Sequence, residues 1–237
     1  GGFLMIDVLV AGAGPVGLTT AIYARLSGLD VVVVEPREGP IDKACGEGLM
    51  PDAVARLARI GVDPLGRDFC GIRYLSGKLV AEARFSGSPG RGVRRTELTN
   101  ALIERARALG VKIVPGRVDA IVQDDTWIEA AGIRSRYLIG ADGLHSQVRR
   151  SLGLASVKGR QQRFGVRQHF AIEPWTDLVE VYWLSDAEVY ITPVGDGIVG
   201  VAVLGAAPLH IKDAIDRVPD LARRLEGADA ASAPRGA

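Results

Sequence analysis

The sequence contains little cysteine, little histidine and few aromatic residues. Two cysteines in 237 residues, Cys45 and Cys70, do not make a disulfide framework, and three scattered histidines give no reason to assign a metal. Lys and Arg total 29 against 28 Asp and Glu, so the net charge of +1 provides no field that would attract nucleic acid or an anionic membrane. No apolar run reaches the roughly 20 residues of a transmembrane segment, and the first residues lack the pattern of a secretory signal. These absences favour a cytoplasmic protein with a small-molecule partner and leave the oligomeric state open.

A glycine-rich turn follows the first apolar run of the chain. Gly12, Gly14 and Gly17 have the spacing G-x-G-x-x-G, and an Ala- and Leu-rich helix is predicted over 16–27. The first glycine allows a tight turn, the second lets a pyrophosphate approach the backbone, and the third lets the helix pack against the strand. The N-terminus of the helix then faces the anion.

Glu35 ends the next apolar run, at the place where dinucleotide-binding folds carry a ribose-binding carboxylate. A carboxylate there accepts both ribose hydroxyls and repels a 2′-phosphate. The sequence therefore predicts a bound ADP moiety without that phosphate, as in FAD or NAD. The alternative is a structural turn followed by an exposed glutamate at a strand end.

The chain up to residue 153 alternates helices and strands. Thr96 is a candidate N-cap for a helix that ends near Leu109, and Cys70 is expected to be a buried small hydrophobe. The predicted elements are helices at 51–60 and 96–109, a hairpin at 71–85, a strand at 111–114, a meander of short antiparallel strands at 117–137, and a second apolar strand from 137 that ends in Gly and Asp.

Beyond Gly153 the pattern becomes antiparallel β. Four strand-like runs at 164–172, 178–184, 188–192 and 198–204 contain most of the large aromatic residues. A helix at about 211–225 follows, with a break expected at Pro219. Residues 227–237 are expected to form a loop.

Three segments occur in a fixed order. They are the glycine turn with Glu35, Arg95-Thr96-Glu97-Leu98 at the start of a helix, and the run 140–149 with Asp142-Gly143 and Arg149. Together they resemble the FAD-dependent aromatic hydroxylases, the group A flavoprotein monooxygenases, over residues 5–204. The resemblance implies that Asp142, Gly143 and Arg149 help to hold the flavin and the nucleotide that reduces it, and that Arg95 contacts the ribityl chain.

The resemblance also implies an activity. It is an NAD(P)H-dependent monooxygenation of an aromatic or polyketide-like small molecule through a flavin C4a-hydroperoxide, with FAD as the cofactor and NADPH or NADH as the transient reductant. No side chain is a convincing acid or base, so catalysis is expected to depend on placement. The substrate-pocket candidates are Trp183, Tyr190 and Pro193.

A second resemblance gives an alternative. The run Lys43-Ala44-Cys45-Gly46-Glu47-Gly48 resembles the Cys-Gly segment of geranylgeranyl reductases, FAD enzymes that saturate isoprenoid double bonds. Val181-Tyr182-Trp183 matches part of their lipid-pocket motif, but Leu184-Ser185 stands where that motif has Phe-Pro. Cys45 is then either catalytic or redox-active, or an inert loop thiol.

The resemblance to both groups sets the predicted organisation. The fold class is α/β: a Rossmann-like FAD-binding domain (1–70 and 93–157) with an inserted β-meander, and an antiparallel β-sheet substrate domain (71–92 and 158–226). A further FAD-contacting segment of the family is expected after residue 237, so a catalytically incomplete fragment is a second alternative. The cofactor-binding candidates share positions at turns and strand ends: Gly12, Gly14, Pro15, Val16, Gly17, Glu35, Pro36, Arg37, Cys45, Gly46, Arg95, Val118, Asp142, Gly143 and Arg149.

Overall fold

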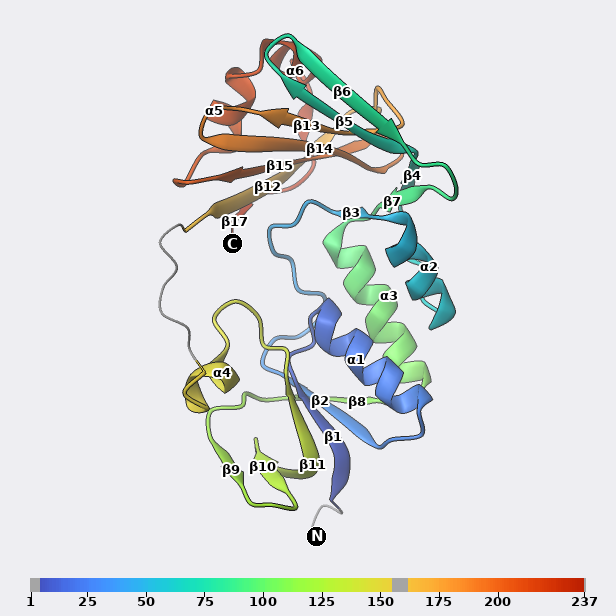
Figure 1. Ribbon diagram of the computed structural model, residues 1–237, viewed down its shortest axis with the longest axis vertical. Coiled ribbons are helices and arrows are strands. Elements are labelled where there is room, and N and C mark those ends of the chain that lie inside the picture. Colours follow the sequence, from blue (N-terminus) through green and yellow to red (C-terminus); the bar gives the residue numbers. More distant parts are fainter. Residues whose placement is uncertain (1–4, 155–161, 237) are drawn as a thin grey trace. The chain divides into compact units, whose positions relative to one another are not determined.

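The computed structural model describes residues 5–154 and 162–236, which divide into two compact units (Figure 1). The first unit contains residues 5–41, 60–62 and 98–154, and the second contains 42–59, 63–97 and 162–236. Each unit has its own large sheet and its own apolar core. The predicted domains were defined by their roles toward cofactor and substrate, so their boundaries stay a prediction. Residues 155–158, next to one of these boundaries, lie outside the described residues.

The first unit is built on a six-stranded sheet of order β8-β2-β1-β11-β10-β9. Its parallel half consists of β1 (Ile6–Ala11), β2 (Val31–Glu35), β8 (Lys112–Pro115) and β11 (Ile133–Gly140). Helix α1 (Pro15–Leu26) packs against β1 and β2 through Leu18, Ala21 and Ile22. Residues 8–11 of β1 and 31–34 of β2 are buried, continuous apolar runs, as expected for parallel strands covered on both faces. The predicted α/β class is confirmed.

The predicted meander is present, with a different end. Strands β9 (Ile121–Gln123) and β10 (Ile128–Ala130) pair antiparallel with each other and with the first part of β11. The prediction separated the last meander strand from the next apolar strand, and this was wrong, because β11 is one strand. Ser135 in β11 lies opposite Ile128 of β10 on one side and Ile6 of β1 on the other. Helix α4 (Gln147–Ser151) follows this strand.

Helix α3 (Arg95–Ala108) begins one residue earlier than predicted. Thr96 is therefore inside the first turn and is not the N-cap. Leu102 and Ala106 are buried on this helix. The helix ends before Gly110, which has a φ of 81°.

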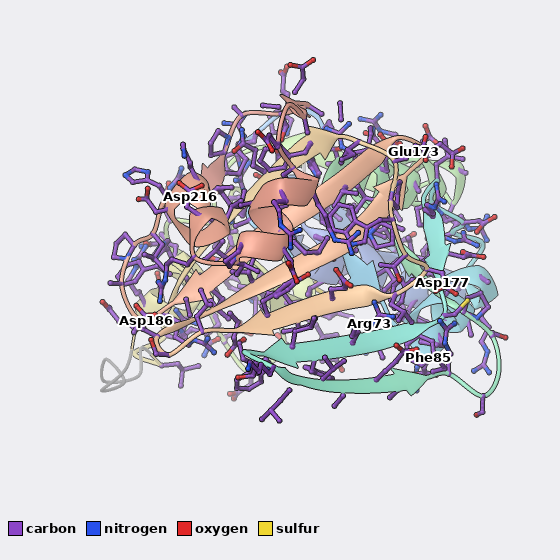
Figure 2. All side chains as sticks on the ribbon, turned by 90° about the horizontal axis from the view of Figure 1, so that it is seen from above. Arg73, Phe85, Glu173, Asp177, Asp186 and Asp216 are labelled. Atoms are coloured by element: carbon purple, nitrogen blue, oxygen red, sulfur yellow. The ribbon has the colours of Figure 1, made fainter. Side chains whose placement is uncertain are left out.

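The second unit is built on a sheet of order β16-β12-β15-β14-β13-β5-β6, with β17 also paired to β12. The predicted strands and hairpin are confirmed as β5 (Gly71–Ser76), β6 (Leu79–Arg84), β12 (Phe164–Ala171), β13 (Val179–Trp183), β14 (Ala187–Gly195) and β15 (Ile198–Gly205). Arg73 of β5, labelled in Figure 2, donates hydrogen bonds to Glu82 of β6 and to Glu180 of β13. It therefore connects three neighbouring strands. Two short strands, β16 (Asp229–Ala230) and β17 (Arg235–Gly236), lie in the segment predicted as a loop. They form because β12 offers backbone groups at its edge, which a local sequence pattern does not reveal.

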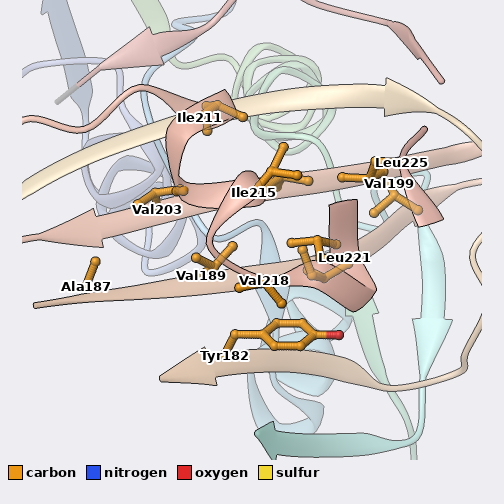
Figure 3. Packing of buried hydrophobic residues seen from close by; sticks show 13 residues of the cluster. Tyr182, Ala187, Val189, Val199, Val203, Ile211, Ile215, Val218, Leu221 and Leu225 are labelled. Carbon is orange, nitrogen blue, oxygen red and sulfur yellow. The ribbon is translucent and has the colours of Figure 1, made fainter. Parts of the chain in front are cut away.

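Two short helices cover one face of this sheet (Figure 3). Helices α5 (Ile211–Asp216) and α6 (Pro219–Arg224) replace the single predicted helix, and the expected break at Pro219 is confirmed. Their apolar residues Ile215, Val218 and Leu221 pack against Val189 and other residues of the central strands. Helices α5 and α6 do not cover the opposite face of this sheet.

A small sheet completes the second unit. It has the order β3-β7-β4, formed by β3 (Gly48–Leu49), β7 (Gly90–Gly92) and β4 (Arg67–Phe69), and helix α2 (Pro51–Arg59) contacts β7. Phe69 is buried against Phe85, with ring centroids 5.8 Å apart. Cys70, predicted to be buried, is exposed, because it follows Phe69 and extended neighbours point to opposite faces. Within the described ranges, no helix is long and apolar enough to cross a membrane.

Candidate functional site

The glycine turn of the first unit is fixed by close packing at two of its glycines. Gly12 has a φ of 104°, and a Cβ added to it would lie 2.5 Å from the carbonyl oxygen of Ala141. A Cβ on Gly17 would lie 1.9 Å from the carbonyl oxygen of Gly12. Residues with side chains cannot replace either glycine without moving the backbone. The turn is therefore held against the end of β11 by the absence of side chains.

Gly14 differs from both, since a Cβ built there has nothing within 4 Å among the described residues. Gly14 is the N-cap of α1, and this helix has no acidic residue in its first turn. An open helix N-terminus presents backbone N–H groups and a partial positive charge, which suit a phosphate group. The residues of this turn thus fit the pyrophosphate of a dinucleotide, with Pro15 and the exposed Val16 opening the helix.

Glu35 ties the end of β2 to the glycine turn. It is 4% exposed, in contrast to the alternative of an exposed strand-end glutamate. Its Oε2 accepts the N–H of Ala13 at 3.0 Å, and its Oε1 accepts the backbone and Nε donors of Arg37 at 3.2 and 2.9 Å. A carboxylate oxygen can accept more than one hydrogen bond, so ribose hydroxyls remain possible donors.

The Asp142 segment lies at the carboxyl end of β11. Asp142 Oδ2 accepts the backbone N–H groups of Gln147 and Val148 at 2.6 and 3.1 Å, and Oδ1 is buried with no hydrogen-bond partner in the described part of the chain. Burial raises the pKa of Asp142, but the hydrogen bonds from Ser146, Val148 and Gln147 outweigh it and lower the pKa. The unpaired Oδ1 is an acceptor that a ligand hydroxyl could satisfy.

Other candidates of the first unit have partners within the protein. The guanidinium of Arg149 donates to the Leu144 carbonyl at 2.6 Å. The side chain of Val118 is part of the apolar core. Gly143 has a φ of 87°, and Pro36 directly follows Glu35. Their roles toward a cofactor stay predictions.

The second unit contains a pocket of about 400 Å³ on the sheet face opposite α5 and α6. Strand register places Tyr74, Val181 and Tyr190 side by side on this face. Trp183 also lines the pocket, and Pro193 is not among the lining residues in the described ranges. Burial and a hydrogen bond to Glu188 raise the pKa of Tyr190 to about 12, so its phenol is neutral. The full lining set is Cys45, Gly46, Glu47, Gly48, Met50, Phe69, Ile72, Tyr74, Val179, Val181, Trp183, Tyr190 and Thr192.

The loop of residues 45–48 forms the polar wall of this pocket. Thr192 Oγ1 donates to the Gly46 carbonyl at 2.8 Å, and the thiol of Cys45 accepts the Glu47 N–H at 3.4 Å. Arg95 belongs to the same unit, and its N–H donates to Glu47 Oε1 at 2.9 Å. The structure therefore brings together Cys45, Gly46, Trp183 and Tyr190, which the sequence placed near a flavin or a substrate.

Three buried residues of this unit were missed as site residues. Glu47, Arg167 and His169 are 5%, 1% and 1% exposed, and His169 Nε2 lies 2.6 Å from Glu47 Oε2. His169 was dismissed because it has no ligand spacing along the chain. The alternation Arg167-x-His169 on a strand could have indicated two polar side chains on one face. In the described ranges, no group of three or more His, Cys, Asp or Glu could hold a metal.

Comparison with known families supports the nucleotide assignment. The family model described as FAD binding domain matches residues 5–204. A solved structure described as geranylgeranyl bacteriochlorophyll reductase-like, from Thermoplasma acidophilum, superposes with a TM-score of 0.83 at 22% identity and covers 100% of this chain and 66% of that chain. This likeness shows the Rossmann-like fold of flavoproteins.

Curated relatives include reductases and a monooxygenase. Menaquinone reductase of Mycolicibacterium smegmatis is 37% identical over 71% of this chain and 46% of its own length. Rifampicin monooxygenase of Rhodococcus hoagii is 34% identical over 62% of this chain and 33% of its own length. Digeranylgeranylglycerophospholipid reductase of Methanosarcina acetivorans is 32% identical over 62% of this chain and 40% of its own length. The chain spans about half the length of the first of these relatives.

Proposed function

The chain belongs to the FAD binding domain family of flavin-dependent oxidoreductases, and from this premise we propose that it reduces a carbon–carbon double bond of an apolar, isoprenoid-type molecule. The observation that carries the proposal is the pocket of the second unit. One wall is the Cys45-Gly46 loop, and the other is an apolar sheet face with Val179 and Val181. A pocket of this lining suits a hydrocarbon chain, because it offers few polar groups for a charged substrate.

Each unit has its own part in this proposal. The turn at Gly12–Gly17 and the N-terminus of α1 bind the pyrophosphate of FAD, and Glu35 receives the ribose. When bound, FAD would supply the two-electron chemistry, with NADPH or NADH as the transient reductant. The pocket side chains exclude water and orient the double bond.

The relatives support the reductive reaction. The names of the Mycolicibacterium and Methanosarcina proteins both describe reductases, and the Cys45-Gly46 loop resembles the Cys-Gly segment of geranylgeranyl reductases. Trp183 and Tyr190 are the side chains of this chain that we assign to substrate orientation.

The test is an anaerobic assay with FAD, NADPH or NADH, and a prenylated quinone. The flavin absorbance of the purified chain shows whether cofactor is bound. After any quinol is reoxidised in air, mass spectrometry should show a quinone that retains two additional hydrogen atoms in its prenyl chain. Trp183→Ala should raise KM, since this half-exposed side chain lines the pocket. Trp127→Ala is the matched control, because Trp127 stacks with Arg134 in the first unit. Flavin binding with no reduced product would overturn the reductive assignment.

A monooxygenase is the second candidate. Tyr74, Trp183 and Tyr190 give the pocket three aromatic side chains, which favour a flat ring, and rifampicin monooxygenase is among the relatives. The same chain in air should then consume oxygen only when substrate is present and should release a hydroxylated product. Substrate-independent oxygen uptake would argue against it.

A further inference from the structure

Glu47 is the centre of a buried charged cluster under the pocket loop. From the loop 45–48, its side chain reaches two other segments of the second unit, the start of α3 and β12. Oε1 accepts the N–H of Arg95 at 2.9 Å, and Oε2 lies 2.6 Å from His169 Nε2. A buried carboxylate costs free energy unless it is paired, so these contacts stabilise its position.

The backbone of Glu47 is held in an uncommon conformation. Its φ is 58°, in the left-handed region that residues with side chains rarely adopt. Its N–H donates to the thiol of Cys45, and its carbonyl accepts the N–H of Val93 at 2.7 Å. These backbone contacts, together with the side-chain contacts to Arg95 and His169, hold the turn in which Cys45 and Gly46 line the pocket.

A glycine in β15 leaves space for the carboxylate of Glu47. Register places Thr192, Gly200 and His169 side by side, and a Cβ on Gly200 would lie 3.2 Å from Glu47 Oε2. The glycine thus provides the space into which Glu47 enters, between two polar neighbours.

The hydrogen bonds of the cluster assign a role to each ring nitrogen of His169. Arg167 Nη1 lies 3.3 Å from His169 Nδ1, and because arginine only donates, Nδ1 is the acceptor and Nε2–H faces Glu47. Arg167 also bonds Asp42, which bonds Arg235 at 3.1 Å. Two arginines then face two carboxylates, and Ser232 Oγ lies 3.0 Å from Nδ1.

We propose that Glu47 is a positioning residue, which through His169 and the Arg95 amide fixes the Cys45-Gly46 wall of the pocket. The inference rests on the proposed function in treating that pocket as the substrate site. Glu47 contacts no reacting atom in this role. It sets where the thiol of Cys45 and the carbonyl of Gly46 lie.

The test measures the reactivity of Cys45 toward iodoacetamide by intact mass. A Cys70→Ser background removes the other cysteine, which is exposed and outside the pocket. Glu47→Ala should raise the alkylation rate of Cys45 about tenfold, which corresponds to roughly 1.4 kcal/mol of lost loop closure. Glu47→Gln should restore only part of the protection, because its single amide oxygen can replace one of the two acceptor oxygens, while its NH2 group then faces a donor of His169 or Arg95.

Two further variants separate positioning from general stability. Leu221→Ala removes a fully buried side chain of α6 in the same unit and should lower stability without raising Cys45 reactivity below the melting transition. Glu47→Gly relieves the left-handed backbone but removes the side-chain contacts, so it should react like Glu47→Ala. If Glu47→Ala does not fold, His169→Gln and Gly200→Ala take its place, because both changes disturb the position of the Glu47 carboxylate. Each should then raise the alkylation rate of Cys45.

A folded Glu47→Ala variant whose Cys45 reacts at the parental rate would overturn the inference. The readout needs no substrate turnover. If the chain lacks reductase activity but the alkylation rate of Cys45 still depends on Glu47, only the proposed function is contradicted. If the chain is an active reductase but the alkylation rate of Cys45 does not depend on Glu47, only the positioning role is contradicted.

Discussion

At the scale of single residues, the three glycines of the first turn have different physical tasks. Gly12 and Gly17 are required by packing, while Gly14 faces open space in the described structure. Gly14→Ala should leave the melting temperature of the cofactor-free chain unchanged, and it should weaken FAD binding at least about tenfold, since ligand and methyl group compete for one place. Flavin fluorescence titration measures the binding. Gly12→Ala is the comparison, and it should lower the melting temperature as well.

Asp142 gives a pH dependence at the same scale. Its pKa is lowered in the folded chain, so its contribution to stability is present above the unfolded value of about 3.8 and is lost as the pH falls through the lower folded value. Asp142→Asn should therefore reduce stability at pH 7 and have a smaller effect near pH 3. Urea unfolding at the two pH values tests this. An equal loss at both would show that the charge of Asp142 does not matter.

At the scale of elements, helix α6 has one fully buried side chain. Leu221 is fully buried against the sheet and lies two residues after Pro219, which separates this short helix from α5. Leu221→Ala should cost about 2–5 kcal/mol of unfolding free energy, the usual range for a core leucine. The matched change is Arg223→Ala on the same helix, whose side chain is 75% exposed, and it should cost less than about 1 kcal/mol. Urea unfolding of both variants makes the comparison.

The elements also show how far a sequence can predict this molecule. Apolar runs and turn residues predict the strands of both sheets and the break at Pro219, because those signals are local. The single strand β11 was not predicted, since its two halves differ in pattern and only the neighbours β10 and β1 make it continuous. The exposure of Cys70 follows from side-chain alternation after the buried Phe69, and the sequence alone did not show which of the two neighbours faces the core.

The same difference between local and long-range signals applies to the candidate site. The glycine turn and Glu35 lie close in sequence and were identified from spacing. The cluster of Glu47 with Arg95 and His169 joins segments 48 and 122 residues apart, and no local pattern predicts which of them meet. The available local signals were the position of Glu47 in a Cys-Gly-Glu-Gly run and the alternation of Arg167 and His169 on one strand.

At the scale of the whole molecule, the two units should respond to different ligands. The proposed FAD contacts lie mainly in the first unit, which contains Trp127, and the pocket lies in the second, which contains Trp175 and Trp183. A variant that retains only Trp127, and a Trp127→Phe variant that retains Trp175 and Trp183, let fluorescence report unfolding of each unit separately. FAD at 100 times its Kd should stabilise the Trp127 transition by about 2.7 kcal/mol, because a ligand that binds only the folded state shifts the equilibrium by mass action.

Gly14→Ala should lower this stabilisation to about 1.4 kcal/mol or less at the same FAD concentration, because its Kd rises at least about tenfold. A prenylated quinone should raise the transition of the second unit, reported by Trp175 and Trp183, without FAD. The Trp183→Ala change then identifies the pocket, since it should remove the effect of the quinone while the effect of FAD on Trp127 persists. Stabilisation of the Trp175 transition that survives Trp183→Ala would mean that the quinone binds elsewhere. Equal shifts of both transitions by either ligand would mean that the two units unfold together, and the assignment of ligands to units would then depend on Gly14→Ala and Trp183→Ala alone.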